Sequence, residues 1–505
     1  MVKHGRGWFV ARGLVALALH VGFYVGGVTI GLVALGLALV TAYERQGREI
    51  FATGVLLAIA CFTFYATFAS PFARGEKVEA PGPELDGPRA PELLALVRDV
   101  AVRMRTAPPS RVFLVAEANA YVVEHGGLLG FGARRWLAIG LPLLHAFDRT
   151  ELVAVLAHEL GHYAAGDTRL AGIAYRTRRR LAHAFTALSG TPTSLGIIEL
   201  GRGIVQWLVT GYAKLYLRAT ATISQAQELA ADEASVALGG RDAAASALTK
   251  VELADAAYTY LLVHELVPFA LAGAWPSDVW GAFRALFDRE DLRAEVLAAG
   301  RSAKTDPYDT HPSLSDRTAR IASLPDPGVA RDPRPALDLV KLDEALVAEV
   351  ERMLTIDERG QRIPLRPAGW DEAGAIHGRL QYEVARVAAA ALHPHVGGST
   401  FLDMSRAVVR WLPERGALFL AIALDPRVGG LVGAFQAEVA EEVFVRNVGA
   451  VVGVALVEIG GAWHTDVGKP LVVRLGGVDH DPFALARAAA LEPGGIDRLG
   501  KILHP

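Results

Sequence analysis

DRTELVAVLAHELGH, residues 148–162, is the stretch of sequence on which the rest of the interpretation depends. Asp148 and Glu151 have capping-box spacing, which predicts that a helix starts there. Apolar residues follow at helical spacing and predict a face that packs against a core. On such a helix His158 and His162 lie one turn apart on the same side. The stretch therefore predicts two imidazoles that converge on one point.

Two imidazoles at this spacing can share one tetrahedral Zn²⁺. Glu159 is set off the ligand side, where it can contact a zinc-bound water without binding the metal, as in the HExxH arrangement of zinc-dependent proteases. Among 15 histidines, a chance match has a probability of roughly a few per cent. A second His-Glu pair, His264-Glu265, lacks the second histidine and is followed by Pro268, so we expect no metal there.

A third protein ligand must leave one coordination position open. Glu228 is the best candidate, and Asp232 follows it by one turn on a strongly helix-forming segment. We expect Asp232 to accept a hydrogen bond from a ligand histidine and so to set its tautomer. The alternative is an ordinary charged helix face.

Four blocks in this order resemble the M48 family of membrane-associated zinc metallopeptidases, which includes the HtpX and Ste24 proteases. They span roughly residues 110–322, less than half of the chain. The blocks are Asn119-Ala120-Tyr121, His158 to His162 with Asp167 after it, Ser224 to Asp232, and Asp306 to Pro312 followed by Arg317.

The resemblance implies a gluzincin-type fold, one zinc ion per chain bound by His158, His162 and Glu228, and Glu159 as catalytic base. It also implies that Asn119 and Ala120 lie on an edge strand that receives extended peptide, and that His311 and Arg317 lie near the catalytic cleft. Asp167 either orients a histidine or caps the helix. Gln225 stands where the family commonly has arginine. The residues with implied roles are catalytic Glu159, His311 and Arg317; metal-binding His158, His162 and Glu228; supporting Asp232 and Asp167; and substrate-binding Asn119 and Ala120.

The first part of the chain is strongly apolar. Residues 14–40 and 50–72 contain no Asp, Glu, Lys or Arg, and each run is long enough to cross a bilayer, which takes ~20 residues. We predict two retained transmembrane helices rather than a cleaved signal peptide. More basic residues flank the pair than link it, which favours a cytoplasmic catalytic domain at the cell membrane. The segment 195–218 carries charges, so we expect an amphipathic helix packed on the catalytic core or at the membrane surface.

Segments rich in proline and glycine divide the part of the chain that follows the two apolar runs. We predict two transmembrane helices within residues 1–72, a linker at 73–91, a metalloprotease domain at 92–324, a linker at 325–336 and a C-terminal α+β domain at 337–505. The fold class is mainly α, with a small β-sheet from runs at 111–116, 121–123 and 136–139. In the C-terminal domain we expect a helix at 380–392, strands at 417–424 and 451–459, and a loop at His393-Pro394-His395.

Composition narrows the function classes for this 505-residue chain. A net charge of -3, from 51 Lys plus Arg against 54 Asp plus Glu, offers no basic surface for nucleic acid. The single cysteine, Cys61, excludes a disulfide framework. Together with the motif and the resemblance, this predicts a membrane-anchored zinc endopeptidase that acts on proteins or peptides. One role that the resemblance implies is membrane-protein quality control. The alternative is a non-catalytic zinc-binding scaffold that acts through its C-terminal domain. The sequence leaves the oligomeric state open.

Overall fold

A computed structural model describes residues 6–44, 50–72, 80–125, 134–164, 196–302, 311–356, 360–412 and 437–504. The chain divides into two compact units. Unit 1 comprises Met1–Asp255 and Glu290–Ile356, and unit 2 comprises Ala256–Arg289 and Asp357–Pro505. Each unit is therefore built from two separate stretches of the sequence.

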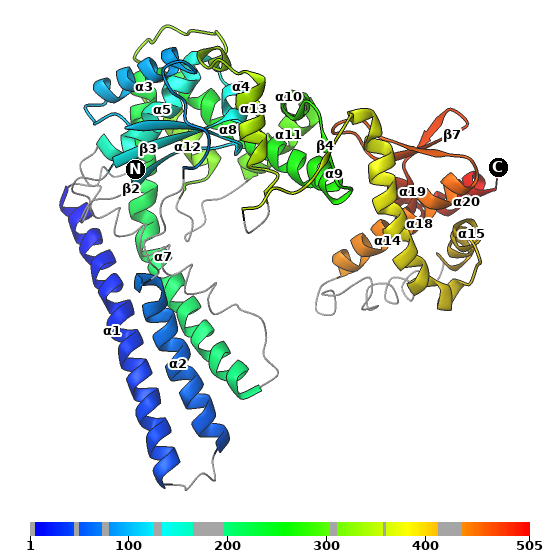
Figure 1. Ribbon diagram of the computed structural model, residues 1–505, viewed down its shortest axis with the longest axis horizontal. Helices are drawn as coiled ribbons and strands as arrows, with labels where there is room; N and C mark the ends of the chain where they lie inside the picture. The colour runs from blue at the N-terminus through cyan, green and yellow to red at the C-terminus, as the bar shows by residue number, and fades with distance from the viewer. Residues whose placement is uncertain are drawn as a thin grey trace. The chain divides into compact units, whose positions relative to one another are not determined.

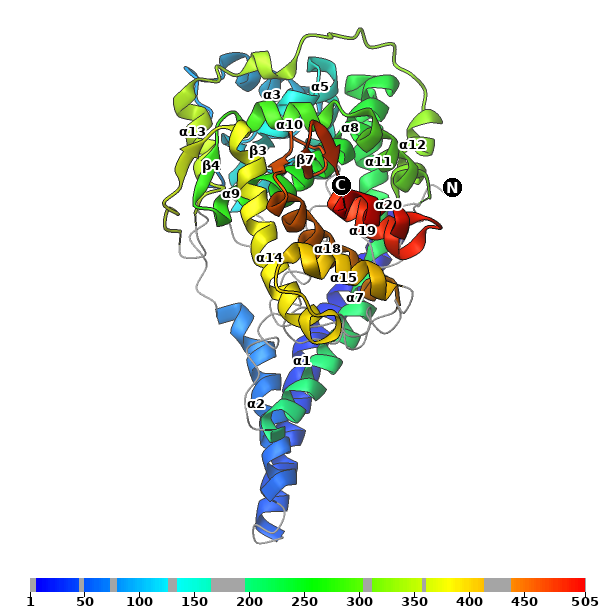
Figure 2. The same cartoon turned by 90° about the vertical axis from the view of Figure 1, so that its right-hand side faces the viewer.

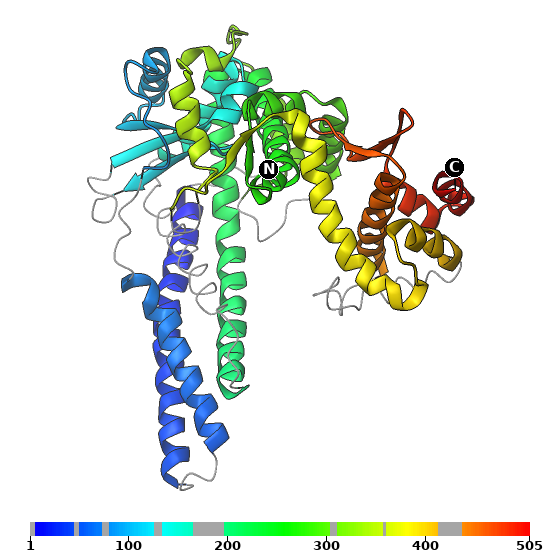
Figure 3. The ribbon, with the colours of Figure 1, turned by 45° about the vertical axis from the view of Figure 1, so that its right-hand side comes forward.

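Three long helices of unit 1 lie side by side, as Figures 1, 2 and 3 agree: α1 (Arg6–Glu44), α2 (Ile50–Phe72) and the first half of α7 (Gly196–Gly239). Within the described residues, Leu17–Tyr43 and Ile50–Phe68 are long and apolar enough to cross a membrane. Leu39 of α1 is 63% exposed and Phe51 of α2 is 59% exposed, whereas a core helix would bury such side chains. These two helices therefore present apolar surface outward, as a membrane protein does.

A three-stranded sheet, in the order β1-β3-β2, lies in the same unit. β3 (Arg134–Gly140) pairs in parallel with β1 (Arg111–Val115) and antiparallel with β2 (Ala120–His125). All three predicted strands are confirmed. Strand β1 is buried from its second residue on, and β2 is an edge strand of this sheet.

The remaining helices of unit 1 surround the sheet and α7. They are α3 (Pro91–Arg103), α4 (Leu141–Ala146), α5 (Arg149–Ala164), α8 (Arg241–Tyr260), α11 (Glu290–Ser302), α12 (Leu314–Ala322), the 3₁₀ turn at Ala336–Leu339 and α13 (Glu344–Arg352). Helix α5 is the predicted HExxH helix. Its capping box is confirmed, because the Glu151 N–H donates to Asp148 Oδ1 and the Asp148 N–H donates to Glu151 Oε2, both at 2.8 Å.

The segment after residue 195 packs differently from our expectation. It is helical, but it continues without a break into the part of α7 that carries Glu228. Val205 and Val209 are buried against Ala66 of α2. We expected this segment either on the catalytic core or at the membrane surface, and the structure instead packs it on α1 and α2, because its apolar side chains meet the apolar surfaces of those helices.

Unit 2 is also mainly helical, with two small sheets, β4-β5 and β6-β7-β8. Its elements are the π-helical turn at Leu261–Leu266, α9 (Val267–Leu271), β4 (Ala274–Pro276), α10 (Val279–Phe287), β5 (Arg366–Ala368), the 3₁₀ turn at Trp370–Glu372, α14 (Ala373–Val396), α15 (Phe401–Trp411), α18 (Ala437–Glu458), β6 (Ala462–His464), β7 (Val472–Leu475), β8 (Val478–His480), α19 (Pro482–Leu491) and α20 (Gly495–Leu503).

Two predictions in this unit were wrong. The run expected as a strand at 451–459 lies mostly in α18, where Val451, Val452 and Ala455 are fully buried. A helix buried on all sides has the same continuous apolar pattern as a buried strand. His393-Pro394-His395 lies in the last turn of α14 rather than in a loop. The strand expected at 417–424 lies outside the described residues.

Helices dominate both units, and the strands form small sheets, so the mainly α architecture with an α+β C-terminal part is confirmed. Residues 256–289 belong to unit 2, although they lie within the range 92–324 that we expect for the protease domain. The boundaries proposed from the sequence stay predictions.

Glu151 holds the start of α5 in place. Its side chain is fully buried. Beyond the capping box, the carboxylate accepts hydrogen bonds from Ser246 at 2.6 Å, Lys250 at 2.8 Å and Arg331 at 3.0 Å. Because α8 and the segment after α12 supply these donors, one carboxylate joins three parts of unit 1.

We predict that Glu151→Gln destabilises the protein strongly. The amide keeps the shape but cannot accept all of the hydrogen bonds that the buried carboxylate accepts from Ser246, Lys250 and Arg331, and a buried group left unsatisfied costs about 1–3 kcal/mol. The melting temperature measured by circular dichroism in detergent should fall by several degrees. Glu383→Gln removes an exposed partner of Arg386 and should leave the melting temperature unchanged. Equal behaviour of the two variants would contradict this role for Glu151.

Candidate metal centre

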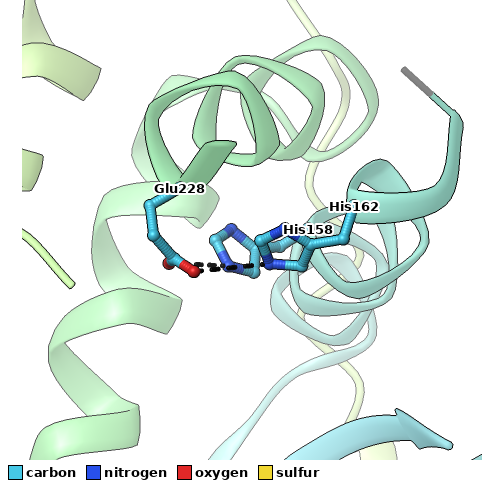
Figure 4. Close-up of side chains that lie close together, drawn as sticks. All are labelled: His158, His162 and Glu228. Atoms are coloured by element: carbon cyan, nitrogen blue, oxygen red, sulfur yellow. Dashed lines mark ion pairs between the residues drawn. The ribbon is translucent and has the colours of Figure 1, made fainter. Parts of the chain in front are cut away.

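Two helices supply the three predicted ligands. Figure 4 shows His158 and His162 of α5 pointing toward Glu228 of α7. The Nε2 atom of His158 lies 3.4 Å from Glu228 Oε2, and Nε2 of His162 lies 3.6 Å from Oε1. The structure therefore brings together residues that are far apart in the sequence.

Small residues allow α5 and α7 to approach closely. A Cβ atom added at Gly161 would lie 3.3 Å from Ala234 Cβ and 3.4 Å from Ala231 Cα. At Gly239 an added Cβ would lie 3.0 Å from Ala154 Cα, which is tighter than ordinary packing. Because a larger residue at either glycine would push the helices apart, this packing sets the distance between the imidazoles and the carboxylate.

The geometry of the three side chains suits a metal ion. One donor atom from each of His158, His162 and Glu228 lies within 4.8 Å of the other two. In a tetrahedral zinc site with bonds of 2.0–2.2 Å, donor atoms lie about 3.3 Å apart. The two nitrogen-to-oxygen distances, each to a different oxygen of Glu228, are close to that value. Two imidazoles and one carboxylate are also a usual donor set for zinc, and they leave a fourth position open.

Asp232 supports the first histidine. Its Oδ1 atom lies 3.1 Å from Nδ1 of His158, on the side of the ring away from the metal position. Arg317 of α12 donates from Nε to Asp232 Oδ2 at 3.0 Å and from Nη2 to Oδ1 at 2.7 Å. Asp232 is 2% exposed. Asp232 is therefore bound by Arg317 on one side and lies beside Nδ1 of His158 on the other.

His311 approaches the same carboxylate from another side. Its Nδ1 atom lies 3.1 Å from Glu228 Oε2, while its side chain is 61% exposed. Arg317 is farther away, with Nη2 at 3.7 Å from that oxygen. His311 thus borders the open side of the centre, and Arg317 lies behind it against Asp232.

The protonation of the cluster follows from burial and charge. Burial raises the pKa of Glu159 to about 7. Burial and a positive charge on His158 lower the pKa of His162 to about 4, so this imidazole is neutral at pH 7. Burial also lowers the pKa of His158, but hydrogen bonds to Asp232 and Glu228 outweigh this effect and raise it to about 9. Burial alone would raise the pKa of Glu228. Its hydrogen bonds with His158 and His311 outweigh that effect and hold the pKa well below its usual range.

One acidic residue near the centre was missed from the sequence. Glu252 of α8 is an exposed residue, but partial desolvation of its carboxyl group, together with the charge of Asp255, raises its pKa, while Arg317 and His311 oppose the shift. It belongs to no motif, so only the packing of α8 could place it near these cations.

The predicted substrate-binding residues lie at the start of β2. Ala120 pairs with Ile139 of β3, and its N–H donates to Asn119 Oδ1 at 2.9 Å. The Asn119 carbonyl accepts from the Gly140 N–H at 2.8 Å. Strand β2 contacts α5, so an edge strand borders the helix that carries both histidines. Asp167 lies outside the described residues.

A family model described as peptidase family M48 matches residues 88–324. This range contains the three candidate ligands, Glu159, and the four sequence blocks named above. The second unit's C-terminal part, from residue 357, lies beyond the match.

Three similar proteins are each named Protease HtpX. The one from Cellvibrio japonicus is 29% identical over 242 residues, which cover 45% of this chain and 78% of that protein. The one from Pseudomonas syringae pv. tomato is 31% identical over 164 residues, which cover 31% of this chain and 52% of that protein. The one from Stutzerimonas stutzeri is 30% identical over 210 residues, which cover 40% of this chain and 69% of that protein. The chain thus spans from about half to three quarters of these relatives.

The crystal structure of Ste24p from S. mikatae is similar to this chain at 15% sequence identity. The alignment covers 62% of this chain and 66% of the Ste24p chain. Its TM-score of 0.26 is low.

We predict that Asp232→Asn weakens metal binding by about 10–100-fold, because His158 loses the charged acceptor at Nδ1. Competition with a chelating dye, using zinc and the detergent-purified protein, measures this change. Asp242→Asn is the matched control, because Asp242 is 86% exposed and lies on α8. An Asp232→Asn protein with unchanged zinc affinity would rule out this orienting role.

Proposed function

This chain belongs to peptidase family M48, and on that basis we propose that it is a membrane-anchored zinc endopeptidase that hydrolyses peptide bonds of protein substrates. The observation that carries the proposal is the convergence of His158, His162 and Glu228 beside a half-buried acidic residue, Glu159. A zinc ion held by the three ligands would supply Lewis-acid activation of water and of the scissile carbonyl.

Glu159 is the proposed general base. It follows His158 directly on α5, and burial raises its pKa to about 7. A carboxylate with a pKa near neutrality can take a proton from the attacking water and pass it to the leaving amine. The buried surroundings of Glu159 thus support both steps at the pH of the cell.

The two cationic side chains differ in their proposed roles. His311 is exposed on the open side and can donate to the oxygen of the scissile carbonyl as negative charge develops. Arg317 has two of its nitrogens bound to Asp232, which supports a positioning role more than direct contact with substrate. Both assignments remain proposals.

We further propose that the substrate adds to the edge of the sheet at Asn119 and Ala120. Strand addition uses the backbone of an extended peptide and makes limited demands on its side chains. The edge position of β2 and its contact with α5 support this route. Such a mode would suit the clearance of damaged membrane proteins, since these differ in sequence.

The first test is Glu159→Gln. The amide cannot accept the proton, so proteolysis of an unstructured protein such as casein should fall by at least about 10²-fold. Zinc content, measured by atomic absorption on the detergent-purified protein, should stay at one equivalent because Glu159 is not a ligand.

His158→Ala separates metal binding from proton transfer. This variant should lose both proteolysis and tight zinc binding, since two ligands cannot hold the ion as three do.

Full activity of Glu159→Gln would overturn the proposed base. A zinc-loaded wild type without proteolytic activity would instead favour the non-catalytic scaffold.

We propose that α1 and α2 span the cell membrane and that the catalytic part faces the cytoplasm. The orientation rests on the basic residues at the outer ends of the helix pair. We therefore predict that alkaline phosphatase fused after Pro505 is inactive and that a fluorescent protein fused there is fluorescent in bacterial cells. The opposite pair of results would reverse the orientation.

A further inference from the structure

A segment that follows α12 is closely bound to the start of α5. We call residues 331–336 the strap; they lie in unit 1, beyond the range that the family model matches. The Arg149 N–H donates to the Arg334 carbonyl at 2.9 Å, and the Ala336 N–H donates to the Phe147 carbonyl at 2.9 Å. The strap therefore pairs with the backbone on which the HExxH helix begins.

These bonds supply what the start of a helix lacks. The first N–H groups of an α-helix have no acceptor inside the helix. Arg149 is the first residue of α5, and the strap provides the acceptor for its N–H. In the other direction, the Asp332 N–H of the strap donates to Thr150 Oγ1 at 2.7 Å. Thr150 is 6% exposed, so this contact lies in the interior of the unit.

Arg331 is the side chain that joins the strap to the capping box. Its Nε donates to Asp148 Oδ2 at 2.7 Å, and its Nη2 donates to Glu151 Oε1 at 3.0 Å. Both carboxylates are buried, whereas the Arg331 side chain is 50% exposed. A guanidinium donates in fixed directions from a rigid plane, which an ammonium group does not. Arg331 therefore supplies fixed bond directions to the start of α5 as well as a charge.

Helix α5 is held at two places along its length. The strap and α8 hold its start, and the crossing with α7 holds its later turns near Gly161. His158 lies nine residues after Arg149, which is about 14 Å along the helix at 1.5 Å per residue. A tilt or rotation at the start of α5 therefore moves the imidazoles relative to Glu228, which belongs to another helix.

The candidate metal centre tolerates little movement of this kind. The Nε2 atoms of His158 and His162 lie 3.4 and 3.6 Å from the oxygens of Glu228. A tetrahedral site with bonds of about 2.0–2.2 Å requires distances close to these. A misplacement of about 1 Å can lower the rate of an enzyme by about 10²-fold. The direction of α5 therefore matters for metal binding and for catalysis alike.

We propose that Arg331 is a positioning residue of the candidate metal centre, because through α5 it sets the tilt and rotation that aim His158 and His162 at Glu228. The strap is then part of the working peptidase, although it lies outside the range of the family model. The expected effect on proteolysis rests on the function proposed above. The expected effect on zinc binding does not.

Two substitutions separate bond direction from charge. Arg331→Met removes both, and Arg331→Lys keeps the charge but loses the rigid planar donor. Competition with a chelating dye measures the zinc affinity of the detergent-purified full chain, well below its melting temperature. Both variants should bind zinc about tenfold more weakly, which is the lower end of the loss when the support of a metal ligand is removed. Circular dichroism should show that Arg331→Lys keeps most of the wild-type melting temperature.

Proteolysis of an unstructured peptide at saturating zinc gives a second measurement. In both variants kcat should fall about tenfold, because the ligands and Glu159 are misaligned. KM should stay unchanged, since the proposed peptide-binding strand β2 is held by its pairing with β3. A residue that only stabilises the fold would leave kcat unchanged at a temperature at which all of the protein is folded.

Arg103→Met is the matched control. The Arg103 side chain is 46% exposed and pairs with Asp99 of its own helix at 3.7 Å, so this variant also removes a half-exposed paired arginine. It should change neither zinc affinity nor kcat. Thr150→Val approaches the strap from the other side, because it keeps the shape of the side chain but removes the acceptor of the Asp332 N–H. It should weaken zinc binding by about threefold, as expected for one hydrogen bond.

Unchanged zinc affinity and kcat in folded Arg331→Met would overturn the positioning role and limit Arg331 to stability. Full recovery of both by Arg331→Lys would overturn it too, because charge alone would then suffice. If Arg331→Met does not fold, Arg331→Lys and Thr150→Val decide the question. A wild type that binds zinc but cleaves no peptide would contradict the proposed function, and the zinc affinities would still decide the role of Arg331.

Discussion

The close packing of α5 on α7 is the constraint on which the candidate metal centre depends. Gly161 and Gly239 remove side-chain volume at the crossing, so two imidazoles from one helix and one carboxylate from the other come within bonding range of a single ion. The cluster buries several charges, and each has a partner nearby: Arg317 binds Asp232, and Asp232 holds His158. Such pairing is required because an isolated buried charge is costly.

Helix α7 joins two environments. Its first half packs on the apolar helices α1 and α2, and its second half carries Glu228 and Asp232. An α-helix is stiff over this length, because each added residue contributes one backbone hydrogen bond. One continuous helix therefore links the packing on α1 and α2 to the candidate metal centre.

Local signals in the sequence predicted much of this. The capping box at Asp148 and Glu151 and the spacing of His158 and His162 depend only on helix geometry, and both are confirmed. The strands of the first sheet were also found, because short β-branched runs between turns are a local pattern. The buried helix α18 was mistaken in part for a strand, because a uniformly apolar run has no periodicity that distinguishes the two.

By itself, then, the sequence determined the family, the helix that presents both histidines, and the two apolar helices, since each depends on residues close together in the chain. Only the tertiary structure decided that Arg317 is paired with Asp232, that Glu252 lies near the same cations, and that α7 packs on α1 and α2. These contacts join segments distant in sequence, and their energies depend on burial and approach distance. No local pattern encodes either quantity.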